Sequence, residues 1–322
     1  MFNFNIENFK SSHYLNSPVI FRQGFIPNTS SLKEFYKIIL NPLNGSHESL
    51  VSVLSGTQKV NPSVWSHTFP NDQGQYRDIS ALRTAIELKS SIVFDEYYRY
   101  SQEAKELVVF IQEQFNCFSS CNAYLSQKGG VAFPIHRDGH HVLIFALSGK
   151  KKWTVYNEKQ DMYQAYNKIE STLTDKEIIS SGFFLNEIME AGDILYIPIG
   201  QFHSVENLTD NALHLTVSLH IKPLFTVLED ILLKIYSPES NFPIEVKDIL
   251  NQINPIYQHP IPISNNEMLQ HINILFDAIK QIVTTDDFIA HQNNIQKNKH
   301  LKICVSPTEE LIEEMASAQS ED

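Results

Sequence analysis

One stretch decides the predicted fold: Pro134-Ile-His-Arg-Asp-Gly-His-His-Val-Leu-Ile-Phe-Ala-Leu-Ser-Gly-Lys-Lys-Lys-Trp153. We interpret it as a strand that enters a β-barrel and a strand that leaves it. Successive side chains alternate between the two faces of a strand, so His136 and Asp138 are expected to point the same way. A later stretch, Gly192-Asp-Ile-Leu-Tyr-Ile-Pro-Ile-Gly-Gln-Phe-His203, indicates a buried strand and a Pro/Gly turn. That turn is expected to place His203 at the barrel rim.

Two imidazoles and one carboxylate form a familiar metal-binding set. The 2-His-1-carboxylate triad binds non-haem Fe(II) and leaves coordination positions open. We therefore predict His136, Asp138 and His203 as iron ligands. A His-x-Asp pair alone is common by chance, so the prediction depends on its neighbours. Lys151, at the end of the outgoing strand, has an ammonium that could receive a dicarboxylate.

A strand over residues 120–126 adds a polar stripe to the predicted barrel. Alternation places Asn122, Tyr124 and Ser126 on one face, with apolar residues on the other. A polar inward stripe is unusual in a packed core, but it suits a barrel whose lumen holds a polar ligand. The last predicted strand, 212–219, has Ser218 on its polar face.

Several neighbouring residues have simpler interpretations. His140 and His141 are interpreted as groups that line the site, because Gly139 interrupts the regular strand. The three consecutive lysines could be a solvated charge run, but alternation would turn only the middle one, Lys151, inward. His214, on the last strand, is interpreted as either a lumen group or a satisfied core histidine.

Composition excludes some classes of protein. The chain has 322 residues, of which 42% are hydrophobic and 19% charged, which is typical of a globular protein with one good-sized domain and a smaller one. A net charge of −12 argues against direct nucleic-acid binding and mildly favours a basic protein or peptide substrate. Three cysteines are too few for a disulfide framework. With no signal peptide and no run of about 18 to 20 apolar residues, we predict a cytoplasmic protein without a membrane partner.

The rest of the chain is expected to flank this core with helices. The clearest helical pattern before the barrel covers 103–115, and a shorter one covers 31–40. Strands are expected over 17–25, 49–54 and 91–94, and a polar excursion between barrel strands over 157–187. We predict a catalytic domain over 1–223, a helical region over 224–304 and an acidic, flexible tail over 305–322.

Taken together, these motifs resemble those of a known family. His136-x-Asp138, Gly149-Lys-Lys-Lys-Trp153 and Gly192-Asp-Ile-Leu-Tyr-Ile-Pro…His203 are similar to the motifs of JmjC-type cupin oxygenases. Within that family the chain is most similar to the ribosomal oxygenases, over roughly residues 15 to 222. The resemblance implies a mainly β fold with flanking helices, a double-stranded β-helix of the cupin or jelly-roll type.

The resemblance also implies a function. It implies Fe(II) as metal, 2-oxoglutarate as cosubstrate and O2 as oxidant, with His136, Asp138 and His203 as ligands. Lys151 would hold the distal carboxylate of 2-oxoglutarate, assisted by Tyr124 and Asn122, and Ser218 would lie near the cosubstrate. Hydroxylation of a protein or peptide side chain is the expected reaction, and a homodimer through the C-terminal helices is the expected assembly. The alternatives are hydroxylation of a small molecule or free amino acid, and a cupin that binds metal without turnover.

Overall fold

The computed structural model describes residues 3–39, 50–55, 58–61, 68–71, 74–77, 91–129 and 134–221, together with Asp277. The helices in these ranges are α1 (Ile6–Ser12), α2 (Ser31–Ile39), the 3-10 turn η2 (Tyr97–Arg99), α5 (Gln102–Phe115), α6 (Met162–Tyr166) and α7 (Asp175–Ser180). The strands are β1 (Val19–Phe21), β2 (Val51–Ser55), β3 (Gln58–Lys59), β4 (Thr68–Asn71), β5 (Gly74–Arg77), β6 (Ser91–Phe94), β7 (Phe118–Ser126), β8 (His141–Ser148), β9 (Lys150–Lys159), β10 (Phe183–Glu190), β11 (Ile194–Ile197), β12 (Gln201–Asn207) and β13 (Ala212–His220).

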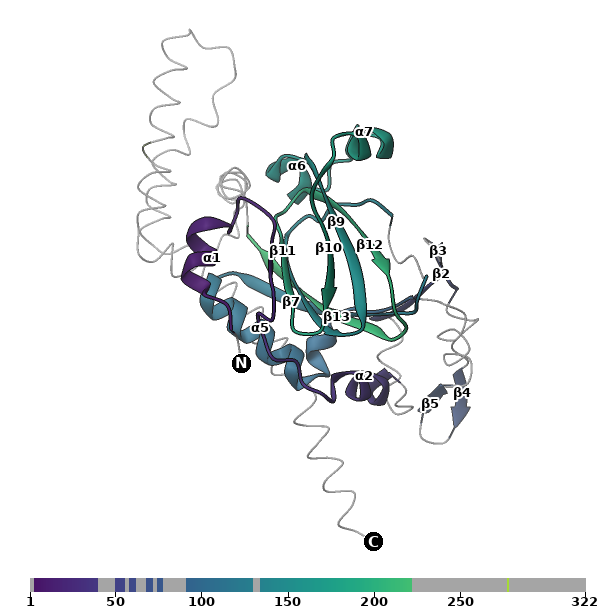
Figure 1. Cartoon of the computed structure of the whole chain (residues 1–322). Helices are drawn as coiled ribbons and strands as arrows, with labels where there is room; N and C mark the ends of the chain where they lie inside the picture. Colours follow the sequence, from purple (N-terminus) through teal and green to yellow (C-terminus); the bar gives the residue numbers. More distant parts are fainter. Residues whose placement is uncertain are drawn as a thin grey trace, which may run out of the picture. The chain divides into compact units, whose positions relative to one another are not determined.

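Two antiparallel sheets face each other and form the double-stranded β-helix (Figure 1). The larger sheet has the order β1-β11-β8-β13-β7-β6-β2-β3, and the smaller has the order β10-β9-β12. Strands that are neighbours in the chain often belong to different sheets: β8 and β11 lie in the large sheet, while β9 and β10 between them lie in the small one. This winding confirms the predicted mainly β fold with flanking helices.

Alternation along β9 sets which side chains enter the space between the sheets. Lys151, Trp153 and Val155 are buried, whereas Lys150 is exposed and Lys152 only half-buried. The Lys150 ammonium instead pairs with Glu190 across the strand, at 2.8 Å. The prediction that only the middle lysine turns inward is confirmed. The buried side chains of β9 pack with those of β8, β11 and β12 in one apolar cluster, so the lumen is walled on both sides.

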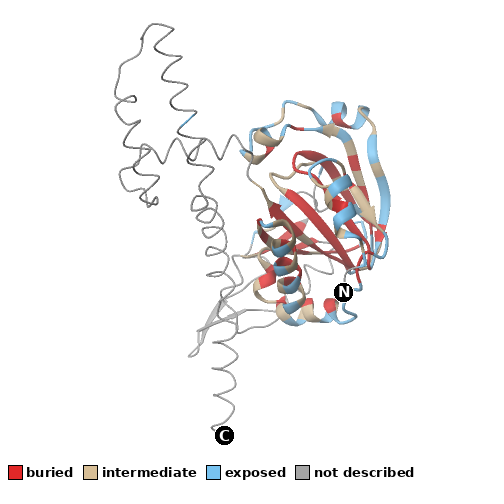
Figure 2. Ribbon diagram, turned by 90° about the vertical axis from the view of Figure 1, so that its left-hand side faces the viewer, coloured by how far each residue is buried: buried red, intermediate tan, exposed pale blue. Residues whose placement is uncertain are grey.

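The longest described helix, α5, covers the outside of the large sheet against β7 (Figures 1 and 2). Ser101 caps its N-terminus by accepting a hydrogen bond from the Ala104 amide, and Asn116 ends it in the left-handed conformation. Its buried stripe consists of Ala104, Leu107, Val108 and Ile111, spaced at helical intervals. The predicted helix over 103–115 is confirmed with one additional residue at its start.

Three local expectations were wrong. Helix α1 occupies a segment for which the sequence suggested no element. The predicted excursion over 157–187 is too wide, because β9 continues to Lys159 and β10 begins at Phe183. Residues 134–138 form no regular strand, and only an isolated bridge joins His136 to His203.

The predicted helical region over 224–304 and the predicted tail over 305–322 lie outside the described residues, apart from Asp277. The domain boundaries and the dimer expected from that region therefore stay predictions. Across the described ranges, none of the helices combines the length and apolar character that a membrane crossing requires.

Gly200 ends the turn that leads to His203, and we expect it to tolerate no side chain. Its φ is +79°, and a Cβ there would overlap the carbonyl oxygen of Gln160. We expect Gly200→Ala to lower the free energy of unfolding by about 2 kcal/mol or more. Gly129→Ala is the matched control, since its φ is +74° but a Cβ there meets nothing within 4 Å. If thermal melts show the same loss of stability in both variants, the predicted steric overlap at Gly200 is contradicted.

Candidate functional site

Backbone pairing brings the three predicted ligands together. The amide of His136 donates to the carbonyl of His203 at 3.0 Å, and the return bond measures 2.8 Å. This cross-strand pair holds the two imidazole rings 4.2 Å apart between centroids. The carbonyl of Asp138 accepts a hydrogen bond from Gly200, at 3.1 Å, and its Oδ2 lies 3.6 Å from Nε2 of His203. One possible ligand atom from each of the three residues lies within 4.8 Å of the other two.

Both imidazoles are oriented by backbone carbonyls. Nδ1 of His136 lies 2.8 Å from the carbonyl of Pro134, and Nδ1 of His203 lies 3.0 Å from the carbonyl of Gln201. A carbonyl only accepts, so each Nδ1 carries the hydrogen, and in the neutral form of each ring the lone pair lies on Nε2. Metal-ligating histidines are commonly oriented in this way. The arrangement thus places two imidazole nitrogens and one carboxylate where they could bind the same metal ion.

Burial keeps His203 neutral. Desolvation lowers the pKa of His203, the neighbouring His136 lowers it further, and the carboxylate of Asp138 opposes the shift. A metal binds only the unprotonated imidazole, so this shift leaves the ligand ready near neutral pH.

The predicted cosubstrate anchor, Lys151, is fully inside the barrel. Its residue exposure is 5%, and its Nζ lies 2.7 Å from Nδ1 of His214. Nζ also donates to Oγ of Ser126 at 3.2 Å and to the carbonyl of Tyr124 at 3.3 Å. Burial lowers the pKa of Lys151 well below its usual value. A carboxylate stabilises the charged form of a buried amine, so an incoming carboxylate would favour the Lys151 ammonium and bind it among these neutral acceptors.

Aromatic rings join the lysine to the histidine cluster. The ring of Trp153 lies 6.1 Å from that of His203 and 5.5 Å from that of His214. Tyr124 stacks on His214 at 4.9 Å with a 6° interplanar angle. A cavity of about 10 Å³, roughly one water in size, borders Lys151, Trp153 and His214.

Two further predicted cosubstrate residues have other partners. The side chain of Asn122 donates to Asp95 and accepts from the Glu96 amide, both at 2.9 Å. Oγ of Ser218 lies 2.7 Å from Oγ of Ser120. Ser218 is four residues along β13 from His214, so the structure does not bring it to Lys151. The roles of Asn122 and Ser218 stay predictions.

Sequence reasoning did not identify the contact that His214 makes. His214 shares one face of the predicted strand with Thr216 and Ser218, which indicated that it faces the lumen. The residue that it contacts there depends on the register of the strands. In the structure β13 pairs with β7 so that His214 lies opposite Tyr124, and Lys151 reaches them both from β9. No feature of the sequence specifies that register.

His141, interpreted as a lining residue, has a structural role next to the cluster. It is 1% exposed, and its Nδ1 lies 2.8 Å from the hydroxyl of Tyr196. Burial lowers its pKa to about 3, with smaller contributions from Lys159 and His140. In the unfolded chain an ordinary histidine titrates near about 6.5.

We expect His141 to make the fold sensitive to acid. Its stabilising contribution is fully present above about pH 6.5 and is lost as the pH falls toward 3, because only the unfolded chain takes up the proton. The slope reaches up to about 1.4 kcal/mol per pH unit. Thermal melts at pH 7 and 5 should therefore differ more for the wild type than for His141→Asn. His13→Asn serves as the control, and equal pH dependence in all three proteins would refute the prediction.

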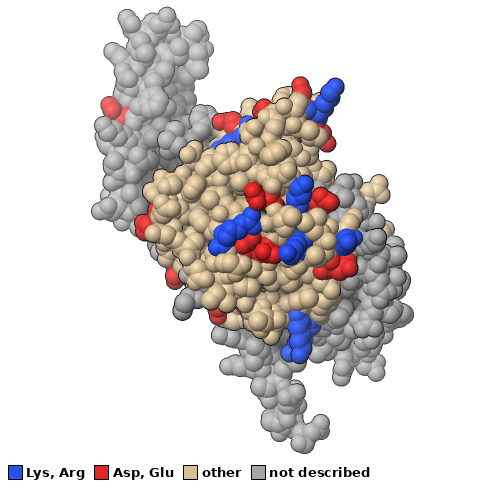
Figure 3. All heavy atoms as spheres, viewed as in Figure 1, with Lys and Arg blue, Asp and Glu red and all other residues tan. Residues whose placement is uncertain are grey.

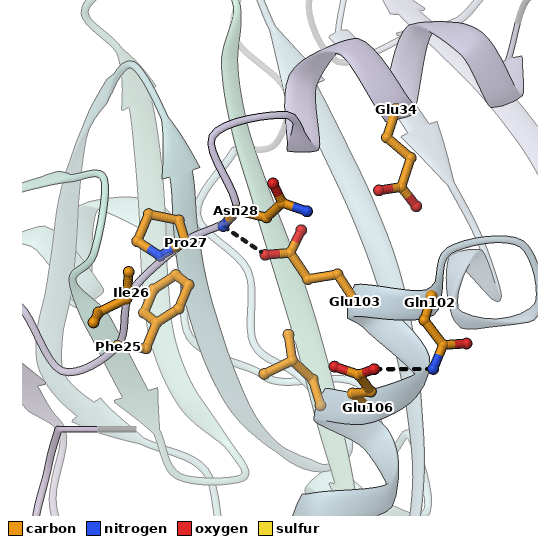
Figure 4. A pocket seen from close by; sticks show the side chains of 9 residues that line it. Phe25, Ile26, Pro27, Asn28, Glu34, Gln102, Glu103 and Glu106 are labelled. Atoms are coloured by element: carbon orange, nitrogen blue, oxygen red, sulfur yellow. Dashed lines mark hydrogen bonds between the residues drawn. The ribbon is translucent and has the colours of Figure 1, made fainter. Parts of the chain in front are cut away.

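A second, larger cavity of about 460 Å³ lies outside the barrel (Figure 4). Two of its three carboxylates have partners: Glu103 accepts from the Asn28 amide at 3.0 Å, and Glu106 accepts from Gln102 at 2.9 Å. The first of these bonds fastens the segment before α2 to α5, and the second lies within α5. The cavity contains none of the predicted site residues. Its lining is Phe25, Ile26, Pro27, Asn28, Glu34, Gln102, Glu103, Glu106 and Leu107.

Charges on the outer face of the small sheet are mixed in sign (Figure 3). Lys150 pairs with Glu190, and Arg22 pairs with both Glu187 and the buried carboxylate of Asp193. Positive and negative groups thus offset one another on this face. It provides no acidic patch to support the prediction of a basic substrate, which stays a prediction.

Comparison with known proteins places this geometry in a family. Residues 96–226 match the model of the JmjC domain. This part of the chain is similar to the JmjC domain. The matched residues include the histidine cluster, Lys151 and the barrel strands from β7 to β13. Strand β1 precedes it but pairs with β11, so the sheet extends beyond the matched residues.

Relatives of the chain include proteins named as oxygenases and hydroxylases. The chain is 32% identical over 123 residues to the "Bifunctional lysine-specific demethylase and histidyl-hydroxylase NO66" of Dictyostelium discoideum, covering 38% of this chain and 24% of that protein. It is 32% identical over 120 residues to "Ribosomal oxygenase 1" of Gallus gallus, covering 37% and 20%. The similarity thus spans a quarter or less of the length of these relatives.

Solved structures share this fold. YcfD, a ribosomal oxygenase from Escherichia coli solved in complex with cobalt and 2-oxoglutarate, aligns with a TM-score of 0.52 and 17% identity. The alignment covers 90% of this chain and 69% of that one. The same protein in complex with cobalt and succinic acid aligns with a TM-score of 0.51 and 16% identity, covering 89% and 69%. At these identities the likeness establishes the fold alone.

Proposed function

We propose that the chain is an Fe(II)- and 2-oxoglutarate-dependent dioxygenase that hydroxylates a side chain of a protein or peptide. The observation that carries the proposal is the convergence of His136, Asp138 and His203, with one possible ligand atom from each within 4.8 Å of the others. Two imidazoles and one carboxylate match the donor set that non-haem Fe(II) prefers. The carbonyl partners of both Nδ1 atoms support the same assignment.

When bound, iron supplies the oxidation of 2-oxoglutarate by O2 that is coupled to substrate hydroxylation. The protein's own groups bind and orient. His136, Asp138 and His203 would hold the metal, and Lys151 would receive the distal carboxylate of 2-oxoglutarate. Trp153 and Tyr124 would form the apolar walls that keep water from the reacting groups.

Names of the relatives support a protein substrate. One is a histidyl-hydroxylase and lysine-specific demethylase, and another is a ribosomal oxygenase. We infer that histidine is the first side chain to test, followed by methylated lysine. Hydroxylation and demethylation differ in outcome, because the first adds an oxygen atom and the second removes a methyl group.

The test is a substrate panel read by mass spectrometry. Ribosomal proteins, histone peptides and free metabolites are incubated with the Fe(II)-loaded protein, 2-oxoglutarate and air. A protein or peptide that gains one oxygen atom, and does not with Asp138→Asn, would support the proposal. Turnover of metabolites alone would favour the small-molecule hydroxylase, and bound iron without consumption of 2-oxoglutarate would favour a binding cupin.

A further inference from the structure

Lys151 has surroundings that the proposed chemistry does not by itself explain. Its Nζ lies between three neutral acceptors: a carbonyl of β7, the hydroxyl of Ser126 and Nδ1 of His214. None of the described carboxylates forms an ion pair with it. A buried ammonium without an anion needs acceptors aimed at it, or it loses its charge.

The shortest of these contacts is the one to His214, at 2.7 Å. Two cations cannot approach so closely in a buried place, so the pair carries at most one positive charge. With Lys151 as the ammonium, His214 is neutral and Nδ1 offers its lone pair. Burial and the neighbouring lysine both lower the pKa of His214, which agrees with the neutral imidazole.

Ring contacts fix the direction of that lone pair. His214 stacks on Tyr124 with an interplanar angle of 6° and meets Trp153 edge-on at 76°. A ring held on two sides cannot rotate freely, so Nδ1 stays aimed at Nζ. The same Trp153 lies beside the ring of His203, which places the lysine and the candidate metal ligands along one wall of the lumen.

We propose that His214 is a positioning residue: its Nδ1 holds the Lys151 ammonium in place for the distal carboxylate of 2-oxoglutarate and so helps to select dicarboxylate over monocarboxylate 2-oxo acids. This inference rests on the proposed function. It assigns a role to a histidine that contacts neither the candidate metal ligands nor, in our account, the reacting atoms.

The test measures ligand binding without turnover. Co(II)-loaded protein is titrated calorimetrically with 2-oxoglutarate and with 2-oxobutyrate, which lacks the distal carboxylate. A hydrogen bond to a charged group contributes enough free energy that its loss weakens binding by about 10- to 100-fold. We expect His214→Leu to weaken the binding of 2-oxoglutarate by that factor. The affinity for 2-oxobutyrate should stay within about 3-fold of that of the wild type.

A conservative variant separates positioning from a structural role. In His214→Asn the amide oxygen falls close to the place of Nδ1, so we expect affinity for 2-oxoglutarate to recover to within about 3-fold of the wild type. If the Asn and Leu variants lose the same affinity for 2-oxoglutarate, or if both ligands weaken together in the Leu variant, the inference fails. Melting temperatures of both variants establish that the titrated proteins are folded.

A double-mutant cycle gives a second, independent readout. If His214 acts through Lys151, then His214→Leu has little further effect on 2-oxoglutarate affinity in a Lys151→Met background. Additive losses would overturn the inference. Failure of the proposed function gives a different result, because wild-type Co(II) protein would then show no preference for 2-oxoglutarate over 2-oxobutyrate at all.

Discussion

Asp138→Asn is expected to abolish succinate formation and to weaken metal binding by at least about 100-fold. The variant keeps the shape of the side chain but removes the only charged donor of the candidate triad. Changing groups that merely support a ligand costs 10- to 100-fold in metal affinity or activity, so loss of a direct ligand should reach at least the upper end. Binding is measured by titration with Fe(II) under anaerobic conditions.

Asp210→Asn is the matched control, because its carboxylate caps an exposed turn by accepting from the Lys128 amide at 2.9 Å. It should bind metal like the wild type. Retention of normal metal affinity and of turnover in Asp138→Asn would show that the carboxylate is not a ligand. The assignment of His136 and His203 would then need another third partner.

Lys151→Met is expected to raise the concentration of 2-oxoglutarate needed for half-maximal turnover by at least about 100-fold. Methionine preserves much of the apolar length but removes the ammonium. The distal carboxylate of 2-oxoglutarate then loses its buried charge partner, and the loss of binding free energy is large enough to give this factor. Metal affinity should stay within about 3-fold, because Lys151 contacts none of the candidate ligands in the structure.

Lys152→Met tests the neighbouring position, since that side chain points to the other face of β9 and is half-buried. Its requirement for 2-oxoglutarate should equal that of the wild type. If both substitutions raise the 2-oxoglutarate requirement equally, the assignment of Lys151 is contradicted. It is also contradicted if Lys151→Met lowers the affinity for metal and leaves the 2-oxoglutarate requirement unchanged.

Alternation in strands carried most of what the sequence could predict. It identified Lys151 as the inward lysine of three, because one face of β9 must be buried and the neighbouring residues Trp153 and Val155 share that face. Helical spacing identified α5 for the same physical reason, a single buried stripe. Both patterns depend only on local periodicity, and a sequence displays local periodicity directly.

Strand β10 shows why local periodicity is not sufficient. Its large apolar residues Phe183, Phe184 and Ile188 are exposed and only Met189 is fully buried, so burial imposes little alternation on it. It forms the edge of the small sheet and is held by pairing with β9. A strand defined by backbone pairing leaves little trace in composition, and the sequence therefore suggested a loop.

Contacts between strands that are distant in the chain could not be predicted from the sequence either. The approach of His214 to Lys151 and the pairing of Ser218 with Ser120 both depend on the register of β13 against β7. A shift of one residue would turn each of these side chains to the other face. Register is decided by the whole sheet, and motif spacing alone did not reveal it.

The measurement that tests the central claim most directly is succinate formation from 2-oxoglutarate by the Fe(II)-loaded protein, with and without O2. The assay measures turnover of 2-oxoglutarate that is not coupled to a prime substrate, so that substrate need not be identified first. Our account predicts succinate only when Fe(II) and O2 are both present, and none from Asp138→Asn. Folded wild-type protein that binds Fe(II) but neither binds 2-oxoglutarate nor forms succinate would contradict it and would leave a metal-binding cupin in place of an oxygenase.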